Sequence, residues 1–225
     1  MLSFTPWGGL EDGDDKASGY NPRRMTRPTE RDFAGGAGDG RRSRFMIAGE
    51  HIILRAFEVG DADRCYRWMN DPNIVRTLKS RYPIAFQNEV EWLERAMRPS
   101  ESERHFAVER REDRAHIGNA SIHGIDWVSR TAWFGFFIGE PSAWNRGFGN
   151  DAIRTLCRFA FDEMNLYKLR INVFDYNDRA THLLLGIGFV QEGKLVNDFY
   201  REGAYHDLVI LSIFRDSKAP VGAAS

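Results

Sequence analysis

Gly139-Glu-Pro-Ser-Ala-Trp-Asn-Arg-Gly-Phe-Gly-Asn-Asp151 connects a run of apolar residues, 132–138, to an amphipathic segment. Glycine at positions 147 and 149 permits a sharp turn and lets an anion approach the backbone closely. Unpaired amides at a helix start attract such an anion, and Arg146 adds a positive charge. The stretch therefore predicts a strand, a loop and a helix that together bind a diphosphate. Glycines at this spacing also occur where only turn geometry needs them.

Two better-known phosphate loops do not fit this stretch. It lacks the G-x-x-x-x-G-K-[ST] pattern of a Walker loop. It also lacks the third glycine of a dinucleotide-binding fingerprint, and its strand lies in mid-chain behind three others. The stretch therefore matches neither of these two loops.

The flanking segments predict a central strand and a long helix. Residues 132–138 are apolar and aromatic along most of their length, which is typical of a strand covered on both faces. The helix is expected from about 151 to 164. One face of it carries a stripe of apolar residues, namely Ile153, Leu156, Cys157, Ala160 and Met164.

The rest of the ordered chain predicts a single α/β domain with a mixed sheet. The expected strands span about 51–57, 105–110, 115–122, 169–173, 191–199 and 205–214. The expected helices span about 61–70, 74–78, 89–97 and 179–185, the first capped by Asp61 and the third by Asn88. Arg201-Glu-Gly-Ala204 predicts a hairpin turn between the last two strands.

Composition excludes several classes of protein. The 225 residues carry 31 basic and 32 acidic side chains, and this balance argues against a nucleic-acid-binding protein. No apolar run approaches the roughly 20 residues of a membrane helix. The acidic N-terminus does not resemble a secretion signal, and two cysteines are too few for a disulfide framework. We expect a cytoplasmic protein without nucleic-acid or membrane partners.

Charge and glycine content divide the chain. Residues 1–45 hold 8 of the 21 glycines, many charges of both signs and no apolar periodicity, so we expect a disordered tail there. Its arginines could instead form a binding arm, although interleaved acidic residues weaken that interpretation. The folded domain is expected at 51–217, followed by a flexible C-terminus at 218–225.

Motifs across the expected domain resemble the GNAT superfamily of N-acetyltransferases. Trp144-Asn-Arg-Gly-Phe-Gly149 is similar to that family's acetyl-coenzyme A signature, Q/R-x-x-G-x-G/A, with Trp in the first position. The downstream motifs look like the branch that contains ribosomal-protein-alanine and spermidine acetyltransferases: Asn165-Leu-Tyr-Lys-Leu-Arg-Ile, Asn177-Asp-Arg-Ala180, Gly188-Phe-Val-Gln-Glu-Gly193 and Gly203-Ala-Tyr-His-Asp207. The resemblance spans about 52–215.

This resemblance implies a fold, a co-substrate and its binding residues. The fold would be a mixed sheet whose fourth and fifth strands splay apart around acetyl-coenzyme A, with no metal. The implied co-substrate contacts are Phe136, Phe137, Ile138, Trp144, Asn145, Arg146, Gly147, Phe148, Gly149, Asn150 and Asn177. Asn177 is equally well explained as a helix cap, and the two roles are compatible.

The implied reaction is direct acetyl transfer to a primary amine, but two expected proton-transfer groups are missing. Trp133 replaces a strand-four Glu of many relatives, and Leu184 replaces a Tyr. His123, at the end of the third strand, and Tyr205, in the final hairpin, are the candidates for acid–base work. The alternative function is an acyl-coenzyme A-binding module with little or no transferase activity.

The acceptor is expected to be a small-molecule amine or a protein N-terminus. Polyamine enzymes of this branch carry carboxylates after the first helix, whereas the matching segment here contains Lys79 and Arg81. That segment suits an acceptor with an anionic group, such as a nucleotide-linked amino sugar or an acidic peptide. Alternatively, both residues are solvated loop charges. The last strands could pair across a homodimer, as in some relatives.

Overall fold

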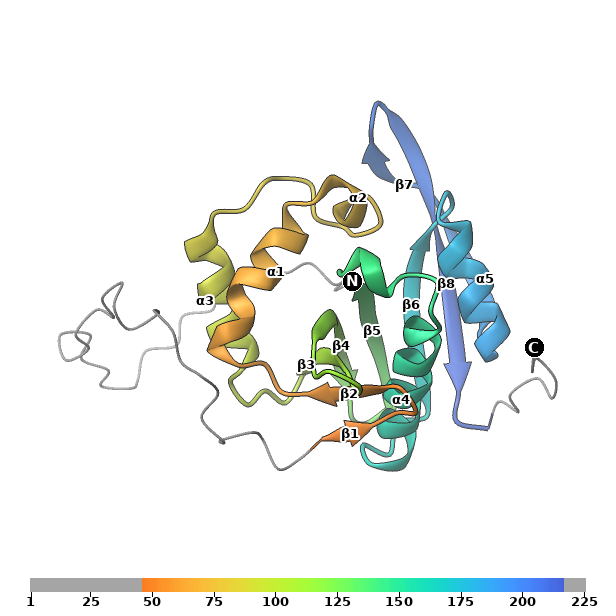
Figure 1. The fold of residues 1–225 in the computed structure, drawn as a ribbon. Helices are drawn as coiled ribbons and strands as arrows, with labels where there is room; N and C mark the ends of the chain where they lie inside the picture. The colour runs from red at the N-terminus through yellow and green to blue at the C-terminus, as the bar shows by residue number, and fades with distance from the viewer. Residues whose placement is uncertain (1–45, 217–225) are drawn as a thin grey trace, which may run out of the picture. The chain divides into compact units, whose positions relative to one another are not determined.

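The computed structural model describes residues 46–216, so the expected tails at 1–45 and 218–225 lie outside the described residues. Eight strands form one mixed sheet in the order β1-β2-β3-β4-β5-β6-β8-β7 (Figure 1). The strands are β1 (Ile47–Ala48), β2 (Ile52–Arg55), β3 (Glu103–Arg110), β4 (His116–Asp126), β5 (Thr131–Ile138), β6 (Lys168–Phe174), β7 (Val190–Arg201) and β8 (Ala204–Phe214). The helices are α1 (Ala62–Met69), α2 (Pro72–Val75), α3 (Phe86–Ala96), α4 (Phe148–Asp162) and α5 (Asp178–Ile187), with short 3-10 turns η3 (Val59–Asp61) and η4 (Pro141–Ala143). The predicted α/β fold with a mixed sheet is confirmed.

Helices cover both faces of this sheet. Neighbouring residues of a strand point to opposite faces, and in β3 Ala107 packs in a cluster with residues of α1 and α3, while Val108 joins the main core beneath α4 and α5. Figure 1 shows α1 and α3 on the side away from α4 and α5. Strand β5 lies between β4 and β6, so its predicted central position is confirmed.

Helix α4 buries the predicted stripe but begins about three residues earlier than predicted. Its first residue, Phe148, is itself a buried core side chain, which fixes the start of the helix ahead of residue 151. Most of the stripe is buried and Met164 is partly buried just beyond the helix. The helix has 15 residues, or about 22 Å at 1.5 Å per residue. No helix within residues 46–216 is both long and apolar enough to cross a bilayer.

Asp151 ties α4 to the first hairpin of the sheet instead of starting the helix. Its carboxylate accepts hydrogen bonds from the backbone N–H groups of Glu50, His51 and Ile52, at 3.0, 2.6 and 3.0 Å. These bonds give acceptors to three backbone N–H groups at the turn between β1 and β2. Strand β1 is short and was not predicted from the sequence.

Asp61 occupies the predicted N-cap position of α1 but does not cap it with its side chain, and the predicted cap Asn88 lies inside its helix. Asp61 makes no capping bond to α1; its carboxylate receives two hydrogen bonds from Arg55, at 2.7 and 2.8 Å. Such a bidentate, charge-assisted pair is stronger than a neutral cap. Helix α3 begins at Phe86, which packs edge-on against Tyr66, so Asn88 lies inside the helix.

The predicted final hairpin is confirmed. Arg201 of β7 pairs with Ala204 of β8, and the two residues between them have φ values of 51° at Glu202 and 84° at Gly203. Positive φ at both central positions defines the turn whose twist matches that of a hairpin.

Candidate active site

The sheet opens between β5 and β6. These parallel strands pair only where residues 131–133 meet residues 168–170. Beyond that point β5 continues along β4, and β6 continues along β8. The remaining length of β5 therefore faces β6 without strand pairing. Because β1 was not predicted, β5 and β6 are the fourth and fifth of the predicted strands, and the splay implied by the family resemblance is confirmed.

A cavity of about 580 Å³ occupies this opening. Its wall is built by β5, the loop before α4, the first turns of α4, and α5. All of the predicted co-substrate contacts line it, namely Phe136, Phe137, Ile138, Trp144, Asn145, Arg146, Gly147, Phe148, Gly149, Asn150 and Asn177. The fold thus brings together residues that the sequence predicted from separate motifs.

The loop at residues 147–150 presents backbone amides to this cavity. Gly147 precedes α4 with φ of 81°, and the first amide that bonds back into the helix is that of Asp151, to the Gly147 carbonyl at 3.1 Å. Among residues 46–216, the amides of Phe148, Gly149 and Asn150 have no backbone acceptor. Unpaired amides at a helix start, reinforced by the helix dipole, form a site for an anion.

Gly149 keeps the approach to these amides open. A methyl group built on it would lie 3.5 Å from the Phe136 ring and 3.6 Å from Leu183, which are ordinary contact distances. The packing of the protein therefore tolerates a side chain at this position. Because Gly149 has no side chain, a group can approach these amides from the cavity. Arg146 lies in the same loop, with its guanidinium 5.6 Å from the Phe148 ring. Glycine, amides and cation together fit a diphosphate.

Trp144 and Asn177 shape the two sides of the cavity. The indole Nε1 of Trp144 donates a hydrogen bond to the Ile138 carbonyl at 2.9 Å, which fixes the loop to the end of β5. The side chain of Asn177 accepts a hydrogen bond from the Ala180 amide at 3.2 Å and caps α5. This bond confirms the capping role. Asn177 also lines the cavity, so the capping role is compatible with a contact to the co-substrate.

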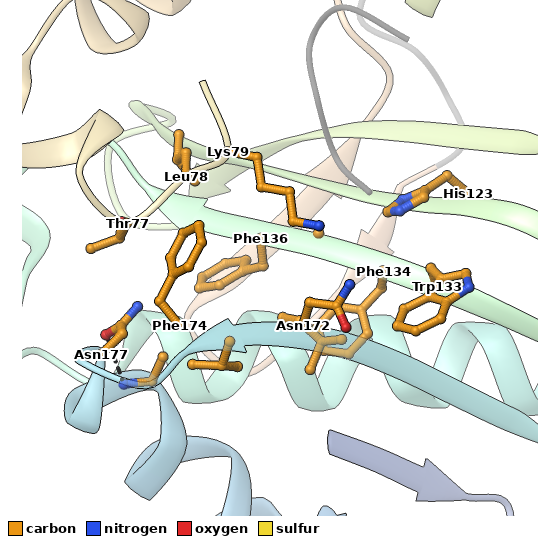
Figure 2. Close-up of a pocket in the computed structure, with 14 residues that line it drawn as sticks. Thr77, Leu78, Lys79, His123, Trp133, Phe134, Phe136, Asn172, Phe174 and Asn177 are labelled. Carbon is orange, nitrogen blue, oxygen red and sulfur yellow. Dashed lines mark hydrogen bonds between the residues drawn. The ribbon is translucent and has the colours of Figure 1, made fainter. Parts of the chain in front are cut away.

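A second, smaller cavity of about 110 Å³ lies next to the first, between β5 and β6. The two share five lining residues: Thr77, Phe136, Ile171, Asn177 and Ala180. Figure 2 shows Lys79, His123, Trp133 and Asn172 around the inner end. None of the described residues that line this smaller cavity is an aspartate or a glutamate.

The two replaced positions form apolar parts of the wall. Trp133 lines the small cavity, with the Arg170 guanidinium 5.7 Å from its ring. Leu184 is 1% exposed and lines the large cavity from α5. Neither side chain can carry a proton at neutral pH, so any acid–base group must come from elsewhere.

The structure separates the two candidates for acid–base work. His123, on β4 opposite Trp133, is buried and lines the small cavity, with Nδ1 3.4 Å from the Ser121 hydroxyl. Tyr205 is 66% exposed beside the hairpin turn, packs against Tyr200, and lines neither cavity. The fold brings only His123 to the site.

The two basic residues after α2 also have different surroundings. Arg81 is exposed and stacks on Phe199 with its guanidinium 4.1 Å from the ring, which agrees with a surface charge. Lys79 is half-buried in the wall of the small cavity. Burial lowers the pKa of Lys79, Asp198 raises it, and Arg81 lowers it further, for a net decrease.

Sequence reasoning missed Asn172. Its Oδ1 atom is buried and has no hydrogen-bond partner among residues 46–216, and its side chain points into the small cavity (Figure 2). A signal was present: Lys168, Arg170 and Asn172 alternate with the apolar residues of β6 and mark a polar face beside the opening.

Comparison with known proteins agrees with this geometry. A family model described as an acetyltransferase (GNAT) domain matches residues 51–190. The chain belongs to the GNAT acetyltransferase family. Among the GNAT relatives, the spermidine N(1)-acetyltransferase of Vibrio cholerae is 31% identical over 157 residues, 70% of this chain and 89% of that protein. The enzyme of the same name from Escherichia coli K12 is 27% identical over 170 residues, 76% of this chain and 89% of that protein.

A solved GNAT structure shows the same fold. The crystal structure of the Vibrio cholerae spermidine N-acetyltransferase in complex with CoA and spermine superposes with a TM-score of 0.69 at 29% identity, over 74% of this chain and 97% of that one. The family and these relatives identify the chain as an N-acetyltransferase, and the alternative of an inactive binding module finds no support among them. Within residues 46–216, no group of three or more His, Cys, Asp or Glu side chains is arranged to hold a metal ion.

Proposed function

We propose that this GNAT protein transfers the acetyl group of acetyl-coenzyme A to a primary amine, on a small molecule or a protein N-terminus, with both substrates bound together. The observation that carries the proposal is that the two cavities are adjacent and share five lining residues. One cavity offers the amides at residues 148–150, and the other reaches buried His123. The 29% identical spermidine enzyme whose structure contains CoA supports the choice of co-substrate.

The large cavity would hold the coenzyme A part. The amides of Phe148, Gly149 and Asn150 would bind the diphosphate, and Arg146 would add a positive charge. Backbone groups of β5 beyond residue 133 would bind the pantetheine arm as an added strand would, because β6 does not pair with them.

The small cavity would hold the reacting atoms. An ammonium ion has no lone pair, so the amine must lose a proton before it attacks the thioester carbon. The buried imidazole of His123 can take that proton directly or through a water molecule. An unpaired backbone N–H of β5 would stabilise the tetrahedral oxyanion. The carbon–sulfur bond then breaks, and the thiolate leaves and takes up a proton.

A coupled pair of measurements tests this function. Calorimetry with acetyl-coenzyme A should show saturable binding, and a thiol-release assay over a broad panel of amines should show release that depends on an acceptor. Binding without acceptor-dependent release would contradict the transferase function. Absence of binding would contradict the assignment of the large cavity as well.

The final hairpin supports a further proposal, that the protein self-associates. Val196, Tyr200 and Tyr205 expose 67%, 50% and 66% of their surface on β7 and β8. Apolar and aromatic side chains that gather on one hairpin are typical of contact surfaces. Light scattering on the purified protein should give at least a dimer, and a monomer at all concentrations would contradict the proposal.

A further inference from the structure

The inner end of the small cavity combines one cation with one unsatisfied acceptor. Lys79 supplies a side-chain ammonium group, and Asn172 supplies a buried carbonyl oxygen. Figure 2 shows both side chains directed into the cavity from opposite walls, Lys79 from the loop after α2 and Asn172 from β6. A ligand placed between them would meet a donor on one side and an acceptor on the other.

No carboxylate among the described residues pairs directly with the ammonium group of Lys79. Among residues 46–216, no carboxylate lies within 4.0 Å of its Nζ atom, and none lines the cavity. Asp198 acts on it from outside the cavity wall, and Arg81 opposes that effect. A half-buried ammonium group with no carboxylate beside it in the cavity favours an anion there and repels a second cation.

The unsatisfied oxygen of Asn172 requires a donor. Buried polar atoms in native proteins are nearly always hydrogen-bonded, and an exception calls for an explanation such as a ligand. A primary amine donates hydrogen bonds, so the Oδ1 atom of Asn172 is suited to hold the amine that becomes acetylated. Its place on β6, two residues past the last pair with β5, puts this contact at the point where the sheet opens.

We propose that this site selects acceptors that carry an anionic group as well as the primary amine: Lys79 binds the anion, and Asn172 Oδ1 accepts a hydrogen bond from the amine. This inference rests on the proposed function, because it assigns the acceptor of the same site. It separates this protein from its relatives named as spermidine acetyltransferases, since a polyamine would place a positive charge against Lys79. The anion is a carboxylate or phosphate, on a small molecule or near the N-terminus of a peptide.

Matched acceptors test the selection directly. The full-length protein is assayed with ω-amino carboxylates of increasing length and with their uncharged amides, beside spermidine. A charge-assisted hydrogen bond is worth about a tenfold or greater difference in affinity, so we expect kcat/KM for the best acid to exceed that for its amide by at least about tenfold. Peptides beginning Ala-Asp and Ala-Asn distinguish a peptide source from a free small molecule.

Four variants assign the effect to residues. Lys79→Met should bring acid and amide within about twofold, and Lys79→Glu should invert the preference towards the amide and spermidine. Arg81→Met is the matched control, because it removes a positive charge from the same loop but not from the cavity wall, and it should keep the acid preference. Asn172→Val should raise KM for acid and amide alike while leaving their ratio unchanged.

The outcomes separate this inference from the proposed function. Transfer to amines with no preference for the acid, or an acid preference that survives in Lys79→Met, would overturn the role of Lys79. Unchanged KM in Asn172→Val would overturn the role of Asn172. No transfer to any amine would overturn the proposed function and this inference together. Acetyl-coenzyme A binding by each variant, measured in parallel, shows that the protein is folded.

Discussion

Gly147 is the residue where backbone conformation most directly limits the site. Its φ of 81° lies in the left-handed region, and no atom within 4 Å would clash with an added Cβ. The constraint is therefore conformational, and for a β-branched residue it costs at least roughly 1–2 kcal/mol. We expect Gly147→Val to weaken acetyl-coenzyme A binding by tenfold or more, measured by calorimetry.

Asparagine provides the control at the same position, because it tolerates left-handed backbone far better than valine does. Gly147→Asn should bind within about threefold of the wild type on that ground. Wild-type affinity in Gly147→Val would show that the amides behind it do not hold the diphosphate.

His123 is the proposed general base. General-base catalysis contributes typically about 10²–10⁴-fold, so His123→Ala should lower kcat/KM by about a hundredfold or more and leave acetyl-coenzyme A affinity unchanged. The matched control is His182→Ala, because His182 is exposed on α5, lines neither cavity, and its Nδ1 contacts the Asp178 carbonyl at 2.7 Å. Full activity of His123→Ala would remove the imidazole from the mechanism.

The sequence predicts which residues belong to the site better than it predicts which way their side chains point. The loop glycines and Asn177 belong to motifs, and motifs fix positions along the chain. Whether Lys79 enters the cavity while Arg81 stacks on Phe199 depends on how the loop after α2 packs against the rest of the domain, which no local pattern encodes. The exposure of Tyr205 likewise follows from the way its hairpin extends beyond the site.

The packing of α3 against α1 buries a carboxylate. Glu89 on α3 is 1% exposed, its Oε2 atom has no partner among residues 46–216, and burial raises its pKa to about 7. In the unfolded state this carboxyl has the ordinary glutamate pKa of 4.5, so between the two values the folded state binds a proton that the unfolded state releases. Stability should therefore fall as pH rises from about 4.5 to 7 and then level off.

Glu89→Gln should remove this pH dependence, because the amide is neutral at every pH. The shift corresponds to roughly 3 kcal/mol at most, so denaturant unfolding should show the variant more stable than the wild type at pH 8 and similar to it at pH 5. Equal stability differences at the two pH values would contradict the assigned titration.

Capping interactions are where sequence patterns failed, and each failure has a tertiary cause. Asp61 was a reasonable cap for α1, but Arg55 and His116 lie close enough to claim its carboxylate. Burial acts to raise the pKa of Asp61, yet the hydrogen bonds from Arg55 and the nearby His116 imidazole outweigh it and hold that pKa well below its usual range. Element types and order were predictable because hydrophobic periodicity is local; the capping interactions were not, because long-range partners decide them.

At the scale of the whole chain, the structure suggests where a shortened protein can begin. A chain that starts at residue 46 keeps β1 and the turn bound by Asp151, whereas one that starts at residue 52 loses both. On the basis of the composition of residues 1–45, we expect the first deletion to leave the melting temperature and acetyl-coenzyme A binding nearly unchanged.

The longer deletion removes several hydrogen bonds, each worth about 1 kcal/mol, and should lower the melting temperature by about 5 °C or more in a thermal scan. A large loss from the shorter deletion would mean that residues 1–45 contact the domain. No change from the longer one would mean that β1 contributes nothing to stability.

The short parallel contact between β5 and β6 has a consequence for local opening of the sheet. Three residue pairs join the strands β1–β5 to the strands β6, β7 and β8, whereas seven pairs join β6 to β8. A molecule that touches both walls of the opening bridges this seam, so its binding should slow amide hydrogen exchange at 131–133 and 168–170 more than elsewhere in the sheet. The bound co-substrate would then stabilise the contact between β5 and β6 as well as supply the acetyl group.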